Sequence, residues 1–124
     1  MCNMLISINP QHVENIFNGT KKYEYRKIRC KQDVDKIIIY STYPIMKIVG
    51  EAKVEKILED SPDNIWEETK NYSGIDLKFY QQYFKDKSKA IAYKLTNIKK
   101  YSIPQELSSY GIKAAPQSFI YIYN

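Results

Sequence analysis

Short runs of apolar residues, either β-branched or alternating with polar ones, constrain the fold of this chain more than any other feature. The run Ile37-Ile38-Ile39-Tyr40 is too short for a helix and predicts a central strand. With period-two alternation elsewhere, the expected strands cover residues 4–8, 22–28, 36–42, 47–58, 90–101 and 118–123. Strands at both termini and few helices between them predict an α/β chain of the α+β kind, a small mixed or antiparallel barrel with helices at its side.

Three short helices are expected between the strands. The first covers residues 10–18, with Asn9 as its N-cap and Gly19 as its left-handed stop. Ser61-Pro62 begins a second helix that continues to about residue 69, and Ile75-Asp76 begins a third. We expect the second and third helices to form a lid or a flank.

Three positions predict irregular backbone in or beside the strands. Gly50 indicates a bulge or a close approach of another segment. The alternation in residues 90–101 changes phase at Asn97-Ile98, which indicates a further bulge. A turn is expected at Pro104, after which the chain enters its last strand.

The length and charge of the chain limit its organisation and its partners. Its 124 residues predict one domain over residues 1–124 with one core. A net charge of +5, from 19 Lys and Arg against 14 Asp and Glu, favours anionic partners such as nucleic acid. Lysine-rich surfaces also keep proteins soluble, and the 12 tyrosines pack in strands as readily as they stack on bases, so both interpretations stay open.

The cysteine and histidine content argues against metal and redox chemistry. Cys2 and Cys30 form no C-x-x-C pair, and His12, the only histidine, is expected to be an exposed helix residue. We therefore expect no metal and no cofactor, and we expect Trp66 to be a packing anchor. No apolar run is long enough to cross a bilayer and no leader pattern is seen, so a cytoplasmic protein without membrane contact is expected.

Charged residues are concentrated in residues 19–26, at the exit from the first helix and the start of the second strand. Glu24 and Arg26 are two residues apart and share one face of that strand. Strict alternation would place Lys21 on the opposite face, so its convergence with Glu24 requires irregular backbone at residues 21–22. On spacing alone, Glu24 and Arg26 form an exposed ion pair on a solvated strand.

The wider pattern resembles the ASCH family of the PUA-like superfamily, which is marked by a G-x-K-x-x-E-x-R run. The similar segments are residues 5–10, 16–19, 21–26, 39–44, 48–51, 57–62 and 114–119. The resemblance implies a small PUA-like mixed β-barrel with flanking helices. It also implies a cleft between the barrel and the first helix, where the motif, the end of the third strand and residues 116–118 meet.

The resemblance implies binding of RNA or of a nucleotide-like ligand with a modified base. The expected ligand-binding residues are Lys21, Lys22, Glu24, Arg26, Ser41, Gln117 and Ser118. In the leading hypothesis the three cations hold phosphate or a base edge, and the glutamate accepts hydrogen bonds from exocyclic amino groups. Ser41 or Gln117 completes the pocket of this non-enzymatic module, which would act in transcription or RNA metabolism.

Two alternatives remain open, as does the oligomeric state. A hydrolase or ribonuclease would use Lys21 and Glu24 as its catalytic candidates. Relatives that remove acyl groups from modified cytidine use a threonine where Glu24 stands here, which weakens the first of these activities. The other alternative is a protein-interaction module that docks a partner on the helix around Tyr80 and Tyr83.

Overall fold

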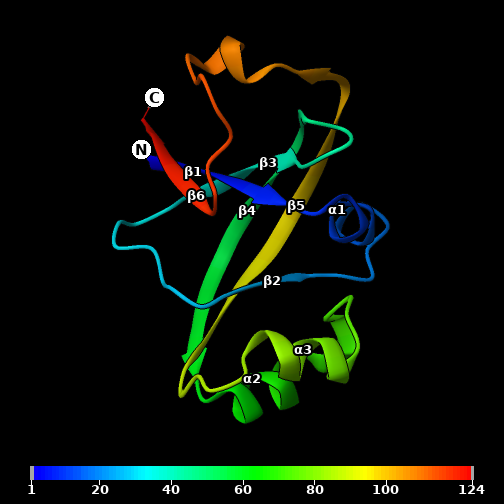
Figure 1. Cartoon of the computed structure of the whole chain (residues 1–124), viewed down its shortest axis with the longest axis vertical. Helices are drawn as coiled ribbons and strands as arrows, with labels where there is room; N and C mark the ends of the chain where they lie inside the picture. The colour runs from blue at the N-terminus through cyan, green and yellow to red at the C-terminus, as the bar shows by residue number, and fades with distance from the viewer. Residues whose placement is uncertain (1, 124) are drawn as a thin grey trace.

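The computed structural model describes residues 2–123 and confirms a mixed α+β chain with strands and helices in the predicted order (Figure 1). The strands are β1 (Cys2–Ile8), β2 (Tyr23–Arg26), β3 (Lys36–Ser41), β4 (Lys47–Asp60), β5 (Ala90–Gln105) and β6 (Phe119–Tyr123). The helices are α1 (Pro10–Phe17), α2 (Pro62–Thr69) and α3 (Leu77–Tyr83), with short 3-10 helices η1 (Lys70–Tyr72) and η2 (Leu107–Tyr110).

All six strands belong to one sheet, in the order β2-β5-β4-β3-β1-β6. β1 pairs in parallel with β3, and the other neighbouring strands are antiparallel. β4 and β5 form a long ribbon that runs along most of the molecule (Figure 1). β2 and β6 stand at the two ends of this order, with no pairing between them among the described strands. Closure of the sheet into a barrel stays a prediction.

The predicted turn at Pro104 is wrong, because β5 continues through this residue to Gln105. β2 pairs with β5 only as far as Lys94, so the later part of β5 has β4 as its sole strand neighbour among residues 2–123. A strand with one free edge tolerates a proline, which cannot donate a ladder hydrogen bond. The Asn9 side chain forms the predicted N-cap of α1, and the Ser61 and Asp76 side chains cap α2 and α3 at the predicted helix starts.

The two predicted irregularities in the strands are confirmed. A Cβ atom at Gly50 would collide with the Lys99 carbonyl oxygen and with the Phe17 ring. Asn97 has a φ of 49°, and the register between β4 and β5 shifts beside it. Such bulges bend a strand pair and increase its twist, which suits a ribbon that spans two cores.

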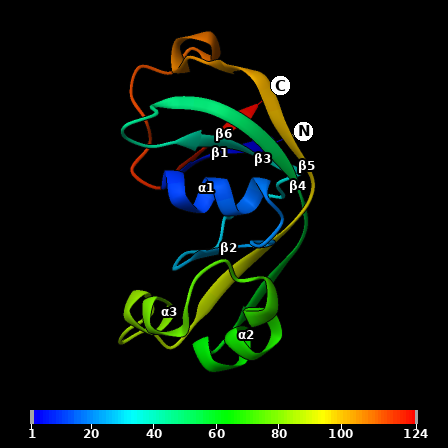
Figure 2. The ribbon, with the colours of Figure 1, turned by 90° about the vertical axis from the view of Figure 1, so that its right-hand side faces the viewer.

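The buried apolar residues form a core under α1, a second core under α2 and α3, and a third cluster of Leu5, Ile38, Tyr40 and Ile48. The first joins Met4, Ile6 and Ile39 of the sheet to Val13 and Ile16 of α1. The second consists of Tyr25, Ile65, Tyr80, Phe84, Ala90 and Ala92. Figure 2 shows β2 passing between α1 and the α2–α3 pair, which places the charged motif at the junction of the two cores.

Candidate functional site

The segment between α1 and β2 directs Lys21 into the molecule. The Lys21 backbone N–H donates to Asn15 O at 3.0 Å, and Lys21 forms an isolated bridge with Ser73. Lys22 belongs to no strand, and β2 begins only at Tyr23. This is the irregular backbone that convergence of Lys21 and Glu24 requires.

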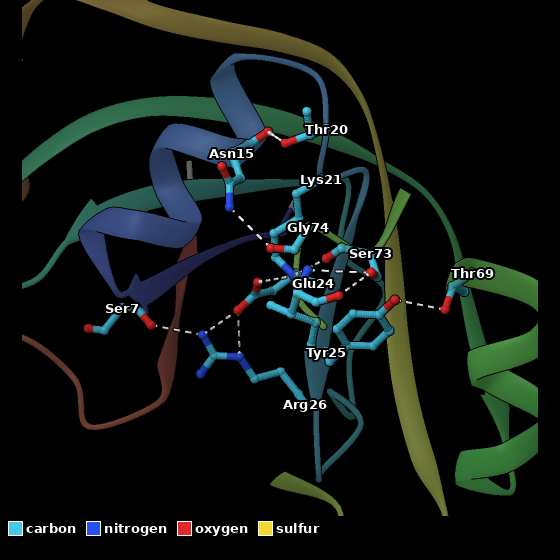
Figure 3. A network of polar contacts seen from close by, with 11 residues as sticks. Ser7, Asn15, Thr20, Lys21, Glu24, Tyr25, Arg26, Thr69, Ser73 and Gly74 are labelled. Atoms are coloured by element: carbon cyan, nitrogen blue, oxygen red, sulfur yellow. Dashed lines mark hydrogen bonds and ion pairs between the residues drawn. The ribbon is translucent and has the colours of Figure 1, made fainter. Parts of the chain in front are cut away.

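The Lys21 side chain is enclosed by polar and aromatic groups (Figure 3), and the residue is 2% exposed. Its ammonium Nζ donates to Ser73 O at 2.9 Å and lies 4.7 Å from the centroid of the Tyr25 ring. Burial lowers the Lys21 pKa and Arg26 lowers it further, whereas Glu24 raises it. A Cβ atom on Gly74, whose φ is 69°, would collide with the Lys21 side chain, so this enclosure depends on the glycine.

Glu24 and Arg26 form a largely buried ion pair, which differs from the solvated pair that their spacing alone indicated. Arg26 Nε and Nη2 donate to the same Glu24 oxygen, Oε2, at 3.0 and 2.7 Å. Arg26 Nη2 also donates to Ser7 O at 2.8 Å, and Nη1 donates to Ser118 Oγ at 3.4 Å. Glu24 is 5% exposed, so its position is set by these partners rather than by water.

Lys21, Glu24 and Arg26 converge on a cavity of about 170 Å³. The closest approach between Lys21 Nζ and Glu24 Oε1 is 3.9 Å. The other residues that line the cavity come from β1, α1, β2 and the region of α3, namely Ile8, Asn9, His12, Tyr25, Ile75, Phe79 and Tyr83. The site is thus a small cleft lined by charged groups together with aromatic and aliphatic ones.

His12 is a cleft residue that the sequence reasoning missed. It is half-buried rather than exposed, and its Nδ1 is buried without a hydrogen-bond partner among residues 2–123. Burial lowers the His12 pKa, with Lys21 and Arg26 acting in the same direction and Glu24 opposing them, so the neutral imidazole is favoured. The available signal was its position in the first turn of the helix that the resemblance places beside the cleft.

The other expected ligand-binding residues lie in different surroundings. Ser118 contacts Arg26, and Gln117 is exposed beside it. Lys22 is exposed, with its Nζ 4.2 Å from the centroid of the Tyr72 ring. Ser41 is 2% exposed at the end of β3. None of these four residues lines the cavity.

No group of three His, Cys, Asp or Glu side chains suited to a metal ion occurs among the residues that the structure describes. Nor does any helix within residues 2–123 have the length and apolar character to cross a membrane.

The fold and the cleft together define a class: a small mixed α+β domain with a buried Lys-Glu-Arg set beside its first helix. The model of the ASCH domain matches residues 6–103, and the chain belongs to the ASCH family. The structure resembles the crystal structure of ASCH from Zymomonas mobilis, with a TM-score of 0.88, 24% identity and coverage of 98% of this chain and 87% of that one. This likeness shows the fold.

Three relatives illustrate how the matching region is distributed among proteins. An "ASCH domain-containing ribonuclease" of Zymomonas mobilis is 28% identical over 92 residues, which cover 73% of this chain and 62% of that protein. An ATP synthase subunit alpha of Ureaplasma parvum is 31% identical over 120 residues, 96% of this chain but 15% of that protein. A ribosomal protein uL22 of Ureaplasma parvum is 29% identical over 120 residues, 39% of its length. The chain therefore spans less than two thirds of each of these relatives.

Proposed function

We propose that the cleft binds RNA, or a nucleotide-like ligand with a modified base, without cleaving it. The observation that carries this proposal is the unused acceptor capacity of Glu24. Its Oε2 accepts two hydrogen bonds from Arg26, whereas Oε1 accepts none from residues 2–123. A carboxylate oxygen with free lone pairs, on a residue that is otherwise almost wholly buried, is suited to the exocyclic amino group of a base.

The two cations of the cleft support the same ligand class. Lys21 and Arg26 outnumber the single carboxylate, which favours phosphate or an electron-rich base edge. Their hydrogen bonds to Ser73 O and Ser7 O hold them in place before a ligand arrives. Such preorganisation lowers the entropic cost of binding.

Family membership adds support, because one relative is named a ribonuclease and RNA is therefore a substrate known for a related chain. We extend the proposal to a role in transcription or RNA metabolism, and to closure of the sheet as a PUA-like barrel. One contact supports the barrel. Arg26 of β2, at one end of the strand order, donates a hydrogen bond to Ser7 O of β1, which is the neighbour of β6 at the other end.

Binding to short RNAs and modified nucleosides, measured by calorimetry at fixed salt, tests the proposal. We expect the Lys21→Ala, Arg26→Ala double variant to lose binding, and unchanged binding there would remove this cleft from consideration. Because that variant also disturbs folding, Glu24→Gln provides the second measurement. The carboxamide keeps the shape but removes the anionic acceptor, so affinity should fall about 10- to 100-fold, as for a hydrogen bond to a charged group.

Glu51→Gln is the matched control, since it makes the same change on β4 outside the cleft. Its affinity should equal that of the wild-type protein. If both variants lose affinity equally, the effect comes from overall charge rather than from the cleft.

A second candidate function is cleavage of RNA or of an acylated nucleoside. It is favoured by the lowered Lys21 pKa, which increases the fraction of the amine in the neutral form that can accept a proton. Incubation with short RNAs and acylated nucleosides should then give product that Glu24→Gln abolishes. Absence of product at high protein concentration would leave binding as the function.

We rank the protein-interaction alternative third, because the tyrosines of α3 on which it was based offer little exposed surface. Tyr80 is 2% exposed and belongs to the core, where its ring packs on Tyr25 and Phe84. Tyr83 lines the cleft. Neither of these tyrosines forms an exposed docking face.

A further inference from the structure

A second hollow adjoins the cleft and is larger, at about 670 Å³. The two share four lining residues, namely Asn9, His12, Ile75 and Phe79. At about 170 Å³ the inner cleft is smaller than the ~300–1,000 Å³ typical of ligand pockets, whereas the two hollows together fall within that range. The continuity indicates that a ligand seated in the inner cleft extends into the outer hollow.

α3 and the residue that precedes its cap supply one half of the wall common to both hollows, and α1 with its cap supplies the other half. Ile75, Phe79 and Tyr83 are spaced four apart, so they follow one side of this segment, and all three line the inner cleft. Tyr80 and Phe84 lie on another side and pack in the second core. Because only one side of the helix packs in the core, an aromatic ring on its other side remains accessible.

Phe79 is that accessible ring, and it stands where the two hollows meet. It is 49% exposed, and its centroid lies 5.5 Å from that of His12 with the ring planes inclined by 70°. The edge-to-face contact with His12 restrains the phenyl ring. An aromatic ring held at the mouth of a polar cleft is suited to stacking on a second planar group.

The outer hollow differs from the inner cleft in charge. Lys and Arg are absent from its lining among the described residues, and its polar members are Asn9, Gln11, His12, Thr20 and Asp76. The Asp76 carboxylate accepts the Phe79 backbone N–H at 2.7 Å as the helix cap. The hollow therefore offers an aromatic ring, uncharged hydrogen-bonding groups and one carboxylate, rather than a phosphate site.

We infer that Phe79 is the stacking platform for the nucleobase next to the one held by Lys21, Glu24 and Arg26. The ligand class is then a dinucleotide or a longer nucleic-acid segment, with one base in the inner cleft and its neighbour on Phe79. This inference rests on the proposed binding function and adds a specificity-determining residue to it.

The test compares mononucleotides with dinucleotides in calorimetry, using 2′-O-methyl nucleotides because they bind without being open to cleavage through the 2′-hydroxyl. Dinucleotides should bind the wild-type protein more tightly than the corresponding mononucleotides. Phe79→Ala should weaken dinucleotide binding about 5- to 150-fold, the effect of losing one base–aromatic stack. Mononucleotide binding should weaken by a smaller factor than dinucleotide binding, since the inner cleft, which Phe79 also lines, keeps its charged residues.

Two variants serve as controls on the same helix. Phe79→Trp preserves a stacking surface and should retain the preference for dinucleotides. Leu77→Ala removes a side chain of comparable exposure, 44%, that lines neither hollow, and should leave both affinities unchanged. A dinucleotide with 2-aminopurine at either position gives a direct signal, because stacking on Phe79 quenches its fluorescence and Phe79→Ala restores it.

The outcomes separate this inference from the proposed function. If mononucleotides bind in a Glu24-dependent way and Phe79→Ala weakens mononucleotides and dinucleotides equally, or weakens neither, the stacking platform is refuted and the inner cleft stands. If neither probe binds the wild-type protein, the proposed function fails, and the platform fails with it.

Discussion

Two Lys-Glu pairs in this molecule have the same chemistry but different surroundings. In the cleft, Lys21 and Glu24 are almost completely buried, and Glu24 Oε1 has no hydrogen bond from residues 2–123. On β3 and β4, Lys36 and Glu51 are partly exposed, and both Glu51 oxygens are used, one by Lys36 at 2.9 Å and one by Tyr101 at 2.7 Å. We call these the cleft pair and the surface pair. A satisfied, solvated carboxylate stabilises a sheet modestly, whereas a buried one with a free oxygen is suited to a ligand.

The largest expected difference between the two regions is in stability. Arg26→Met removes both hydrogen bonds to Glu24 Oε2 and leaves that carboxylate buried, which should lower the free energy of unfolding by about 3–5 kcal/mol. Lys36→Met breaks the surface pair, where water replaces the partner, and should cost under about 1 kcal/mol. Urea unfolding followed by circular dichroism measures both. Equal losses would show that the cleft is as well hydrated as the surface.

The second prediction compares two glycines with nearly the same backbone. Gly74 and Gly111 have φ values of 69° and 71°, so alanine is strained at both, by about 1–2 kcal/mol. Only at Gly74 would the added Cβ meet Lys21, whereas at Gly111 nothing lies within 4 Å. Gly74→Ala should therefore cost about 1–3 kcal/mol more than Gly111→Ala, the range for overpacking a close contact.

Ligand affinity checks the local origin of that difference. Gly74→Ala should weaken nucleotide binding as Lys21 is displaced, and Gly111→Ala should leave it unchanged. Identical unfolding energies and affinities in the two variants would mean that Lys21 adjusts without loss, and that its enclosure is not needed for binding.

The fold was predictable where the determining signals are local in sequence. The Ile37-Ile38-Ile39-Tyr40 strand, the helix cap at Asn9 and the helix start at Ser61-Pro62 follow from neighbouring residues, as do the irregularities at Gly50 and Asn97. The position of Pro104 within β5 could not be predicted in this way, because it depends on where β2 stops pairing with β5. Strand neighbours are set by the whole sheet rather than by the segment.

The cleft was predictable only in part for the same reason. The motif indicated Lys21, Glu24 and Arg26, but Ser73, which binds the Lys21 ammonium, lies 52 residues away in sequence. Phe79 belongs to a helix in which core and cleft aromatics are mixed, so its side could be assigned only after packing was known.

The third prediction uses the pH dependence of Lys21. Its pKa in the folded protein is below 10.5, mainly through burial, so the folded state binds fewer protons than the unfolded state between the two pKa values. The free energy of unfolding should therefore rise with pH through this window. This gain in stability is lost again as the pH falls through the pKa of Lys21 in the folded protein. Lys21→Met should lack this rise, whereas Lys36→Met should retain it. Unfolding in urea at a series of pH values measures the slope, and nitrogen-15 NMR of the lysine side chains locates the titration.

The smallest effect is expected for the surface pair in acid. Burial alone would raise the Glu51 pKa, but the hydrogen bonds from Tyr101 and Lys36 outweigh it and lower the pKa from 4.5. The carboxylate therefore contributes stability that is present above pH 4.5 and is lost as the pH falls through the lowered pKa. Because the pair is partly exposed, Glu51→Gln should destabilise the protein by under about 1 kcal/mol at neutral pH. The deficit should vanish at a pH below the folded pKa, where the wild-type side chain is also neutral. If Glu51→Gln is equally destabilised in acid, the loss comes from packing of the amide. The surface pair would then show no electrostatic effect to compare with that of Lys21.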